Sequence, residues 1–327
     1  MNDPGRIISR IILGLSKRLP FDKLSRSVDT PLIAPFYHAV SDAPLPHIQH
    51  LYPVKNISAF ERDLDFLLKH YRPIDFHELP NILDSKSRQH GQIPMLLSFD
   101  DGLREFHDPI APILLRKGIP AICFLNSGFI DNADLFFRYK ASLLLDTLGA
   151  KASPEKQKEI LSIQYADRGQ LDILAAEIGL DFDDFLLKNQ PYLSTAQIES
   201  LLKQGFHFGA HSVDHPEYRF LPLTEQLRQT TKSTETISNK FGLGYRLFSF
   251  PFTDFGVSKR CFDILLSEKK IAEFSFGCAG IKADFHPQHI QRIPMEINNL
   301  TAEEVLRHAF LYYWLKKPFG RNRIIRS

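Results

Sequence analysis

The chain of 327 residues is long enough to bury a large core, either as one large domain or as two smaller ones. Its 40 basic and 38 acidic residues leave a formal net charge of +2, which argues against a protein that binds nucleic acid through a high overall positive charge. The three cysteines, Cys123, Cys261 and Cys278, have no Cys-x-x-Cys spacing, so we expect buried thiols in a reducing compartment rather than a disulfide framework.

The first predicted element is a basic amphipathic helix within residues 1–29. Its isoleucines and leucine recur at helical spacing, and arginine and lysine supply positive charge. The apolar run is too short to span a membrane, and no signal-peptide cleavage site follows it. Two interpretations stay open: a helix packed on the main domain, or a helix lying on an anionic membrane surface. A predicted C-terminal helix and basic tail, residues 301–327, mixes aromatic and basic residues and would suit the second.

Strands and helices alternate over residues 30–300. The pattern predicts a helix at 58–71 behind Ser58 as N-cap, and a second at 108–118 that stops at Gly118. The segments predicted to contain strands are 30–40, 93–102, 120–130, 205–216, 245–256 and 273–280. This alternation indicates an α/β fold with a mainly parallel sheet.

One segment, about 131–194, interrupts the alternation. It contains four stretches with helical patterns and no strand, so we predict an α-helical insertion. The insertion either covers the site and selects the substrate, with Arg138 and Lys140 meeting an anionic group, or it serves only as a packing element.

Two polar clusters carry the candidate chemistry. Asp100 and Asp101 stand side by side at the end of a predicted strand, and His211 and His215 lie four residues apart. If the second segment begins a helical turn, both imidazoles share one face. Two histidines and a carboxylate with an open fourth position are a familiar catalytic zinc set. The His-x-x-x-His spacing is weak evidence alone, but strand C-termini converge on one face of an α/β barrel, which favours a shared site.

The segments SFDDG (98–102) and HSVDHP (211–216) resemble the first two motifs of the polysaccharide deacetylases, the NodB-type carbohydrate esterases of family four, which remove N-acetyl groups from amino sugars. The resemblance spans roughly residues 36–296, apart from the insertion. It implies an α/β fold, a distorted, incomplete (β/α)7-type barrel with a metal at its mouth.

The resemblance also implies roles for the four polar residues. Asp101, His211 and His215 are the implied ligands of a divalent cation, with Zn2+ expected first and Co2+, Ni2+ or Mn2+ as alternatives. Asp100 is the implied general base. A cation beside it would keep this carboxylate ionised and would lower the pKa of the attacking water, which explains why the two aspartates are neighbours.

The third family motif, R-x-P-aromatic, is only partly present at residues 249–252. The resemblance makes Phe252 the backbone N–H donor for the oxyanion. The arginine that orients the base in relatives is replaced by Ser249. We take Arg292 as the candidate substitute; the alternative is an exposed surface arginine or a structural ion pair.

The last family motif, L-x-H, supplies the histidine that protonates the leaving amine, and it is missing here. His38, at the end of the first predicted strand, is our candidate acid. His286 and His289 occupy the corresponding region, and we interpret them as structural.

The leading hypothesis is a metal-dependent hydrolase that removes N-acetyl groups from an amino sugar in a polysaccharide, oligosaccharide or lipid-linked glycan precursor of surface-polysaccharide synthesis. Two alternatives stay open: a glycan-binding protein of the same fold that has lost turnover, and a deacylase for another acyl group such as formyl. We expect a glycan partner and no nucleic acid, and the oligomeric state stays open. Without a recognisable signal peptide we expect a cytoplasmic protein, with peripheral contact to the inner membrane as the alternative.

Overall fold

The computed structural model describes residue 14 and residues 19–84 and 91–326. The apolar and basic residues of the predicted N-terminal helix therefore lie largely outside the described residues. Within them, the chain begins with helix α2 (Phe21–Arg26), which contacts helix α13 (Ala302–Lys316). Among the described residues, no helix combines the length and the apolar character that crossing a bilayer requires.

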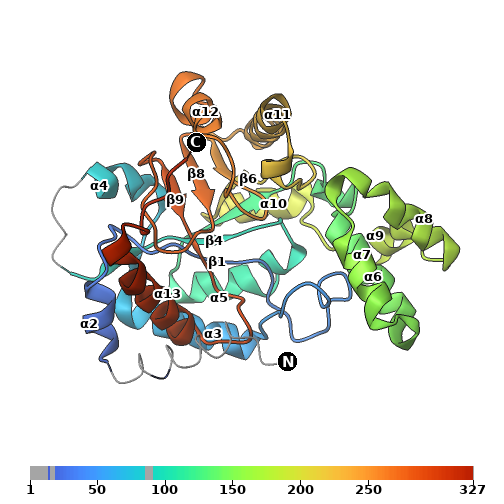
Figure 1. Cartoon of the computed structure of the whole chain (residues 1–327), viewed down its shortest axis with the longest axis horizontal. Coiled ribbons are helices and arrows are strands. Elements are labelled where there is room, and N and C mark those ends of the chain that lie inside the picture. The colour runs from blue at the N-terminus through green and yellow to red at the C-terminus, as the bar shows by residue number, and fades with distance from the viewer. Residues whose placement is uncertain (1–13, 15–18, 85–90, 327) are drawn as a thin grey trace.

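A parallel sheet of eight strands nearly closes into a barrel (Figure 1). Its strand order is β10-β1-β4-β5-β6-β7-β8-β9, and every neighbouring pair is parallel. The strands are β1 (Pro35–Tyr37), β4 (Leu97–Phe99), β5 (Ala121–Leu125), β6 (His207–Ala210), β7 (Leu247–Ser249), β8 (Phe274–Gly277), β9 (His289–Gln291) and β10 (Ile293–Pro294). The predicted α/β barrel is confirmed.

The two edge strands of this sheet, β9 and β10, are halves of one segment with only Arg292 between them. The first half pairs with β8 and the second with β1, so one bent segment joins both ends of the sheet. The eight strands therefore occupy seven positions around the barrel. The sequence analysis did not predict this closing segment, because each half is only two or three residues long and carries polar residues.

Helices cover the outside of the barrel, as Figure 1 shows. These are α3 (Ile57–His70), α4 (Leu79–Asp84), α5 (Ile110–Lys117), α10 (Thr195–Lys203), α11 (Leu223–Phe241), α12 (Lys259–Phe262) and α13. The predicted N-cap Ser58 is wrong: Asn56 caps α3, because its side chain accepts a hydrogen bond from the N–H of Ala59 at 2.8 Å. The predicted stop at Gly118 is confirmed by its left-handed φ of 65°.

A second, two-stranded parallel sheet lies beside the barrel and consists of β2 (Tyr71–Pro73) and β3 (Ile93–Met95). The single strand predicted at 93–102 is therefore split into β3 and β4, with Leu96 between them.

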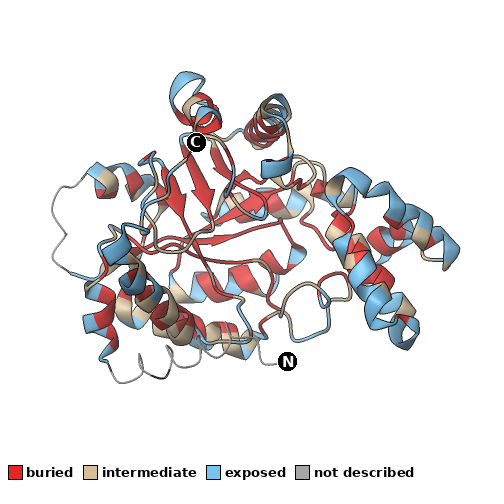
Figure 2. Ribbon diagram, viewed as in Figure 1, coloured by how far each residue is buried: buried red, intermediate tan, exposed pale blue. Residues whose placement is uncertain are grey.

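Alternate residues of the barrel strands face either the interior or the helices. One cluster of buried side chains fills the interior and includes the rings of Phe124 and Phe276, whose centroids lie 5.0 Å apart. The largest cluster packs the outer face of the sheet against the helices. Figure 2 shows the barrel strands buried almost throughout, as expected when both faces of a parallel sheet are covered.

The insertion between β5 and β6 forms a helical lobe at one side of the barrel (Figure 1). Its helices are α6 (Phe137–Leu148), α7 (Pro154–Ser162), α8 (Gly169–Glu177) and α9 (Phe182–Asn189), and each lies in a segment predicted to be helical. The lobe has its own hydrophobic cluster, which also includes Ala39, Ile48 and Leu103 of the barrel loops. Its first helix is thereby held against the loops at the C-terminal ends of the strands.

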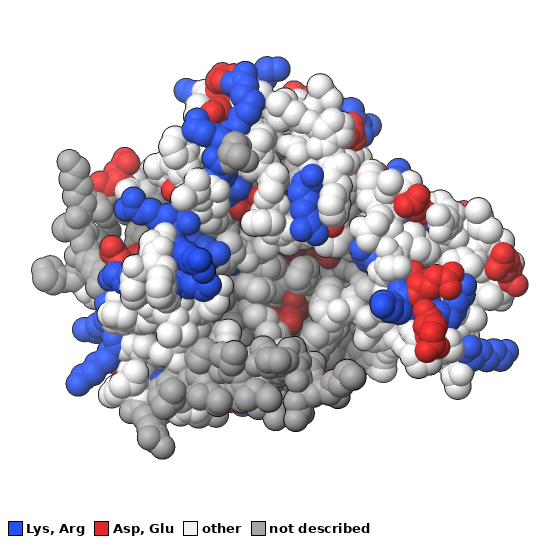
Figure 3. All heavy atoms as spheres, viewed as in Figure 1, with Lys and Arg blue, Asp and Glu red and all other residues white. Residues whose placement is uncertain are grey.

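Charges of both signs are distributed over the face shown in Figure 3. Acidic side chains are visible in the recessed centre of this face, and Lys and Arg side chains lie around it. The described residues on this face therefore form no continuous basic surface of the kind that tracks a nucleic-acid backbone.

Candidate metal centre

Asp100, Asp101, His211 and His215 converge at the C-terminal ends of β4 and β6. The two aspartates directly follow β4, and His211 directly follows β6. Because all strands of the barrel are parallel, these ends lie on the same side of the molecule. The four residues are no more than 5% exposed. The structure therefore brings together two motifs that are about 110 residues apart in the chain.

Three of these side chains form a cluster suited to a metal ion. The Oδ1 atom of Asp101 lies 3.1 Å from Nε2 of His215 and 3.6 Å from Nε2 of His211. Potential ligand atoms of all three residues lie within 4.8 Å of one another. Nδ1 of His211 is 2.8 Å from the carbonyl oxygen of Ser249, so an N–H there would leave the Nε2 lone pair facing Asp101.

A buried carboxylate oxygen at the centre of this cluster supports the same reading. Among the described residues, Oδ1 of Asp101 is buried without a hydrogen-bond partner, although an unpaired buried oxygen is costly. One carboxylate and two imidazoles are a common donor set for zinc. The residues present therefore fit a divalent cation.

The protonation states also suit metal ligands. Burial lowers the pKa of His211 to about 4, so its imidazole is neutral near pH 7. Burial by itself would raise the pKa of Asp101, but the neighbouring His215 holds it well below its usual range. A neutral imidazole and an ionised carboxylate are the forms that bind a metal.

His211–His215 do not begin a helical turn. These residues form a loop in which Ser212 and His215 have φ angles of 69° and 60°. Asp101 and Phe252 also adopt left-handed conformations, with φ of 72° and 57°. Each such residue costs of order 1–3 kcal/mol, so backbone strain is concentrated around the centre. The Ser212 hydroxyl accepts a hydrogen bond from the N–H of His215 at 3.0 Å and so holds the loop.

The helical insertion contributes two aromatic residues that the sequence analysis missed. The hydroxyl of Tyr139 donates a hydrogen bond to Oδ2 of Asp101 at 2.6 Å. Burial, and then the charge of Asp101, raise the pKa of Tyr139, so the phenol keeps its proton and remains a donor. The ring of Phe136 lies 4.2 Å from that of His215. No motif marks these residues; the only signal is the aromatic start of a helix that follows β5.

Arg292 binds Asp100 from the bend between β9 and β10, and in the sheet only β1 separates β10 from β4. Its two terminal nitrogens donate to the two carboxylate oxygens, each at 2.7 Å. It also donates to Ser249 Oγ at 2.6 Å and to Ser98 Oγ at 3.0 Å, and its guanidinium lies 4.2 Å from the centre of the Phe36 ring. With 1% exposure, Arg292 is not the surface arginine of the alternative interpretation.

The charge of Arg292 controls the ionisation of Asp100. Burial by itself would raise the pKa of this carboxyl group, but Arg292 holds it below its usual value. Asp100 is therefore ionised at neutral pH, even though it is almost completely removed from solvent.

His38 lies on the same side of the barrel and is paired with Glu296. Its Nδ1 is 2.6 Å from Oε2 of Glu296, and the N–H groups of His38 and Ala39 also donate to that carboxylate. Burial would lower the pKa of His38, but Glu296 outweighs it and the pKa rises to about 9. The imidazole is therefore protonated near neutral pH.

A cavity of about 420 Å³ connects these groups, which is enough for a sugar ring. His38, Asp100, Asp101, His211, His215 and Arg292 contribute to its wall. Phe252 also lines it and is 38% exposed. Within the described part of the chain its N–H has no hydrogen-bond partner.

The three cysteines are free thiols. Cys123 and Cys261 are buried, as predicted. Cys278 lines the cavity and is only partly buried, in contrast to the prediction.

Several other sequence candidates lie elsewhere. His286 pairs with Asp263, and His289 contacts Ser275 and Asp254; neither histidine lines the cavity. Arg138 lines the cavity, but Lys140 pairs with Asp134 and Asp172 inside the insertion. Of the two basic residues that we expected to meet an anionic group, Arg138 therefore lies on the cavity wall and Lys140 does not.

Comparison with known proteins gives a family match and a set of similar folds. The family model described as Polysaccharide deacetylase matches residues 87–264. No curated protein matches the sequence significantly.

Three similar solved structures share 13–16% identity with this chain. A Streptococcus pyogenes deacetylase, PplD, in complex with acetate has a TM-score of 0.58 and 13% identity, covering 85% of this chain and 97% of that chain. IcaB from Ammonifex degensii has a TM-score of 0.55 and 16% identity, with the same coverage. A putative polysaccharide deacetylase from Bacillus anthracis, BA0330, has a TM-score of 0.52 and 14% identity, covering 85% and 68%. At these identities the likeness concerns the fold.

The contact between the insertion and Asp101 predicts an effect on metal affinity. We expect Tyr139→Phe to weaken binding of Zn2+ about 10–100-fold, because the substitution removes only the hydroxyl that orients a ligand carboxylate. Competition with a chromophoric chelator measures this affinity. Tyr165→Phe is the matched control, since Tyr165 bonds Asp214 instead. Equal affinities for wild type and Tyr139→Phe would contradict the role assigned to this hydroxyl.

Proposed function

The chain belongs to the polysaccharide deacetylase family, and from this we propose that it is a metal-dependent hydrolase that removes N-acetyl groups from an amino sugar of a glycan. The observation that carries the proposal is the buried carboxylate of Asp100, held ionised by Arg292 beside a three-ligand cluster on one cavity wall. The acetyl group is supported by the similar fold of a deacetylase in complex with acetate.

Asp101, His211 and His215 would hold the divalent cation, for which zinc is our first candidate because of the nitrogen and oxygen donor set. When bound, the cation would lower the pKa of the attacking water and polarise the amide carbonyl.

Asp100 is then the general base. Oδ1 accepts one hydrogen bond, from Arg292, whereas Oδ2 accepts one from Arg292 and one from the Ser249 hydroxyl at 3.4 Å. Oδ1 therefore keeps a lone pair that can accept a proton from water. Arg292 fixes the orientation of this base and takes the place of the arginine that Ser249 replaces in the third motif.

The N–H of Phe252 is our donor to the developing oxyanion. Its left-handed φ of 57° is unusual for a bulky residue, and the fold maintains it beside the ring of His215 at 4.6 Å. A preorganised backbone donor at such a position stabilises charge that forms only in the transition state.

His38 is our candidate for the acid that protonates the leaving amine. It lines the cavity, is protonated through its pairing with Glu296, and lies within the wall that also carries Asp100. A cation in the neighbouring cluster would oppose Glu296 and bring the pKa of His38 closer to neutral, where a general acid works best.

We also propose that the C-terminal segment contacts an anionic membrane surface, where a lipid-linked glycan precursor would be available. Leu315 and Phe319 are 54% and 74% exposed, and Lys316 and Lys317 lie between them. Wild type is expected to sediment with vesicles that contain anionic lipid and not with zwitterionic ones. Leu315→Ser with Phe319→Ser is expected to weaken this binding, and equal sedimentation of both proteins would contradict the proposal.

Release of acetate tests the proposed reaction. With Zn2+ or Co2+ added, wild type is expected to release acetate from N-acetylated glucosamine oligosaccharides. Asp100→Asn is expected to lower the rate at least about 100-fold, because it removes the base, while its metal content stays unchanged. Metal retention without acetate release from a broad glycan panel would favour the glycan-binding alternative, and formate as product would favour the alternative acyl group.

The pH profile tests the role of His38. A protonated acid is lost as pH rises through its pKa, and Glu296 raises that pKa. We therefore expect Glu296→Gln, which keeps the shape of the side chain but removes its charge, to move the alkaline limb of kcat/KM to lower pH. An unchanged alkaline limb at unchanged metal content would exclude His38 as the group that controls it.

A further inference from the structure

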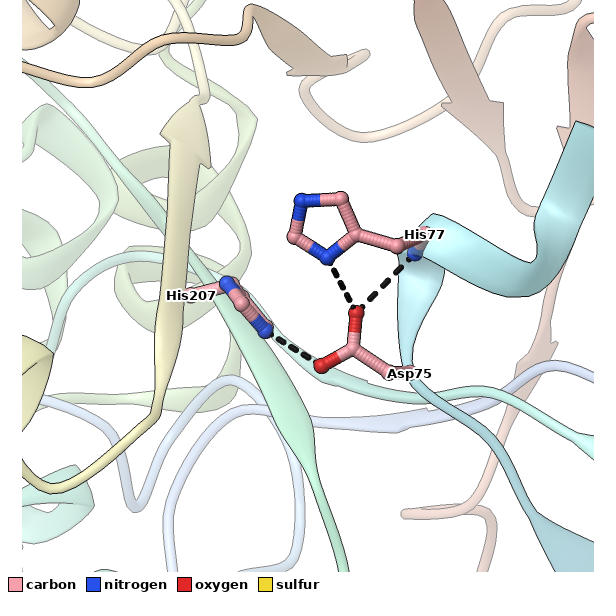
Figure 4. Close-up of side chains that lie close together, drawn as sticks. All are labelled: Asp75, His77 and His207. Atoms are coloured by element: carbon pink, nitrogen blue, oxygen red, sulfur yellow. Dashed lines mark hydrogen bonds and ion pairs between the residues drawn. The ribbon is translucent and has the colours of Figure 1, made fainter.

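We propose that the opposite end of the barrel carries a second binding site for a divalent cation of the zinc type, formed by Asp75, His77 and His207. Figure 4 shows the two imidazoles on either side of the Asp75 carboxylate. Nε2 of His207 is 2.6 Å from Oδ2, and Nδ1 of His77 is 2.6 Å from Oδ1. Potential ligand atoms of the three residues lie within 4.8 Å of one another.

This cluster is separate from the candidate active site. His207 is the first residue of β6, whereas His211 follows the last residue of the same strand. Asp75 follows β2 and caps the short helix η1 (Phe76–Glu78), so the other two ligands come from outside the barrel sheet. The proposal does not depend on the proposed function, because the two clusters share no residue.

The donor atoms suit zinc, cobalt or nickel. Two imidazole nitrogens and one carboxylate are a usual set for these ions, and water completes the coordination at an accessible site. The side chains of His77 and Asp75 are 62% and 35% exposed, while that of His207 is 16% exposed. An ion can therefore reach the cluster from solvent. One of its ligands, His207, belongs to a barrel strand and is largely buried.

Binding would leave no buried N–H group without a partner. Nδ1 of His207 lies 3.4 Å from the hydroxyl oxygen of Tyr245, which can accept its N–H while Nε2 binds the ion. The N–H of Phe208 also donates to this oxygen, at 3.3 Å, and so fixes its position. His77 is largely exposed, so water can accept the N–H of its second ring nitrogen.

Within residues 19–84 and 91–326, no lysine or arginine side chain pairs with Asp75. The nearby Arg72 pairs with Glu78 instead.

A third cluster in the molecule, formed by Asp254, Asp284 and His289, differs from the Asp75 cluster in its partners. There the guanidinium of Arg326 binds both carboxylates, so a fixed cation already occupies the place of a metal. Among the described residues, the ion-pair partners of Asp75 are the two histidines.

A cation at this site would tie the segment after β2 to the start of β6. Because the ligands are assembled only in the folded chain, binding would stabilise the folded state in proportion to ion concentration and affinity. The expected role is therefore structural, at the end of the barrel opposite the cavity.

Metal stoichiometry tests the proposal on the untagged full chain, stripped with a chelator and titrated with Co2+. Wild type is expected to take up about two ions per chain, and His77→Ala about one. Asp101→Asn is expected to keep the ion at Asp75, and this ion is lost when Asp75→Asn is added. His50→Ala, which removes an exposed histidine outside the cluster, is the matched control and is expected to bind as wild type does.

The outcomes separate the two centres. Binding of the same number of ions by His77→Ala and by wild type would overturn the proposal. So would an Asp101→Asn protein that is folded and binds no ion. If wild type binds one ion, and that ion is lost in His77→Ala but kept in Asp101→Asn, the second site stands and the proposed catalytic centre fails.

Discussion

The ion pair between Arg292 and Asp100 is the interaction on which the rest of the site depends. Two charges removed from water are costly. The pair is tolerated because both carboxylate oxygens are bound, two serine hydroxyls and the carbonyl oxygen of Gly277 accept hydrogen bonds from the other N–H groups of Arg292, and an aromatic ring covers the guanidinium. Arg292 lies at the bend between β9 and β10, the segment that joins the two ends of the sheet. The segment that closes the barrel therefore also carries the charge that keeps Asp100, the base of our proposal, ionised.

The candidate metal centre is assembled from residues that are far apart in the chain. Its three candidate ligands follow β4 and β6, while Tyr139 reaches Asp101 from the insertion. Left-handed residues in the three loops around the centre show that the fold stabilises strained backbone there. The insertion thus contributes to the site, because Tyr139 of its first helix binds Asp101, which is a candidate ligand of the ion.

Short motifs at strand ends made much of the site predictable. Asp100, Asp101 and the two histidines could be placed together because strand C-termini of an α/β barrel converge. Tyr139 and Glu296 could not be predicted, since their contacts with Asp101 and His38 join residues 38 and 258 positions apart and no local pattern encodes them. The left-handed backbone of the loop after β6 could not be predicted, because residue spacing does not report it. The closing segment was missed because its halves are too short to give a strand signal.

The acidic limb of the pH dependence of kcat/KM, compared between wild type and Arg292→Met, tests the central claim most directly. Arg292 lowers the pKa of Asp100, and the base is active only when ionised, so activity is lost as pH falls through that pKa. Removing the guanidinium removes the strongest of the influences that oppose burial and is predicted to move the limb to higher pH, with Arg292→Lys between the two. A folded Arg292→Met enzyme with an unshifted limb and a normal rate would contradict the account.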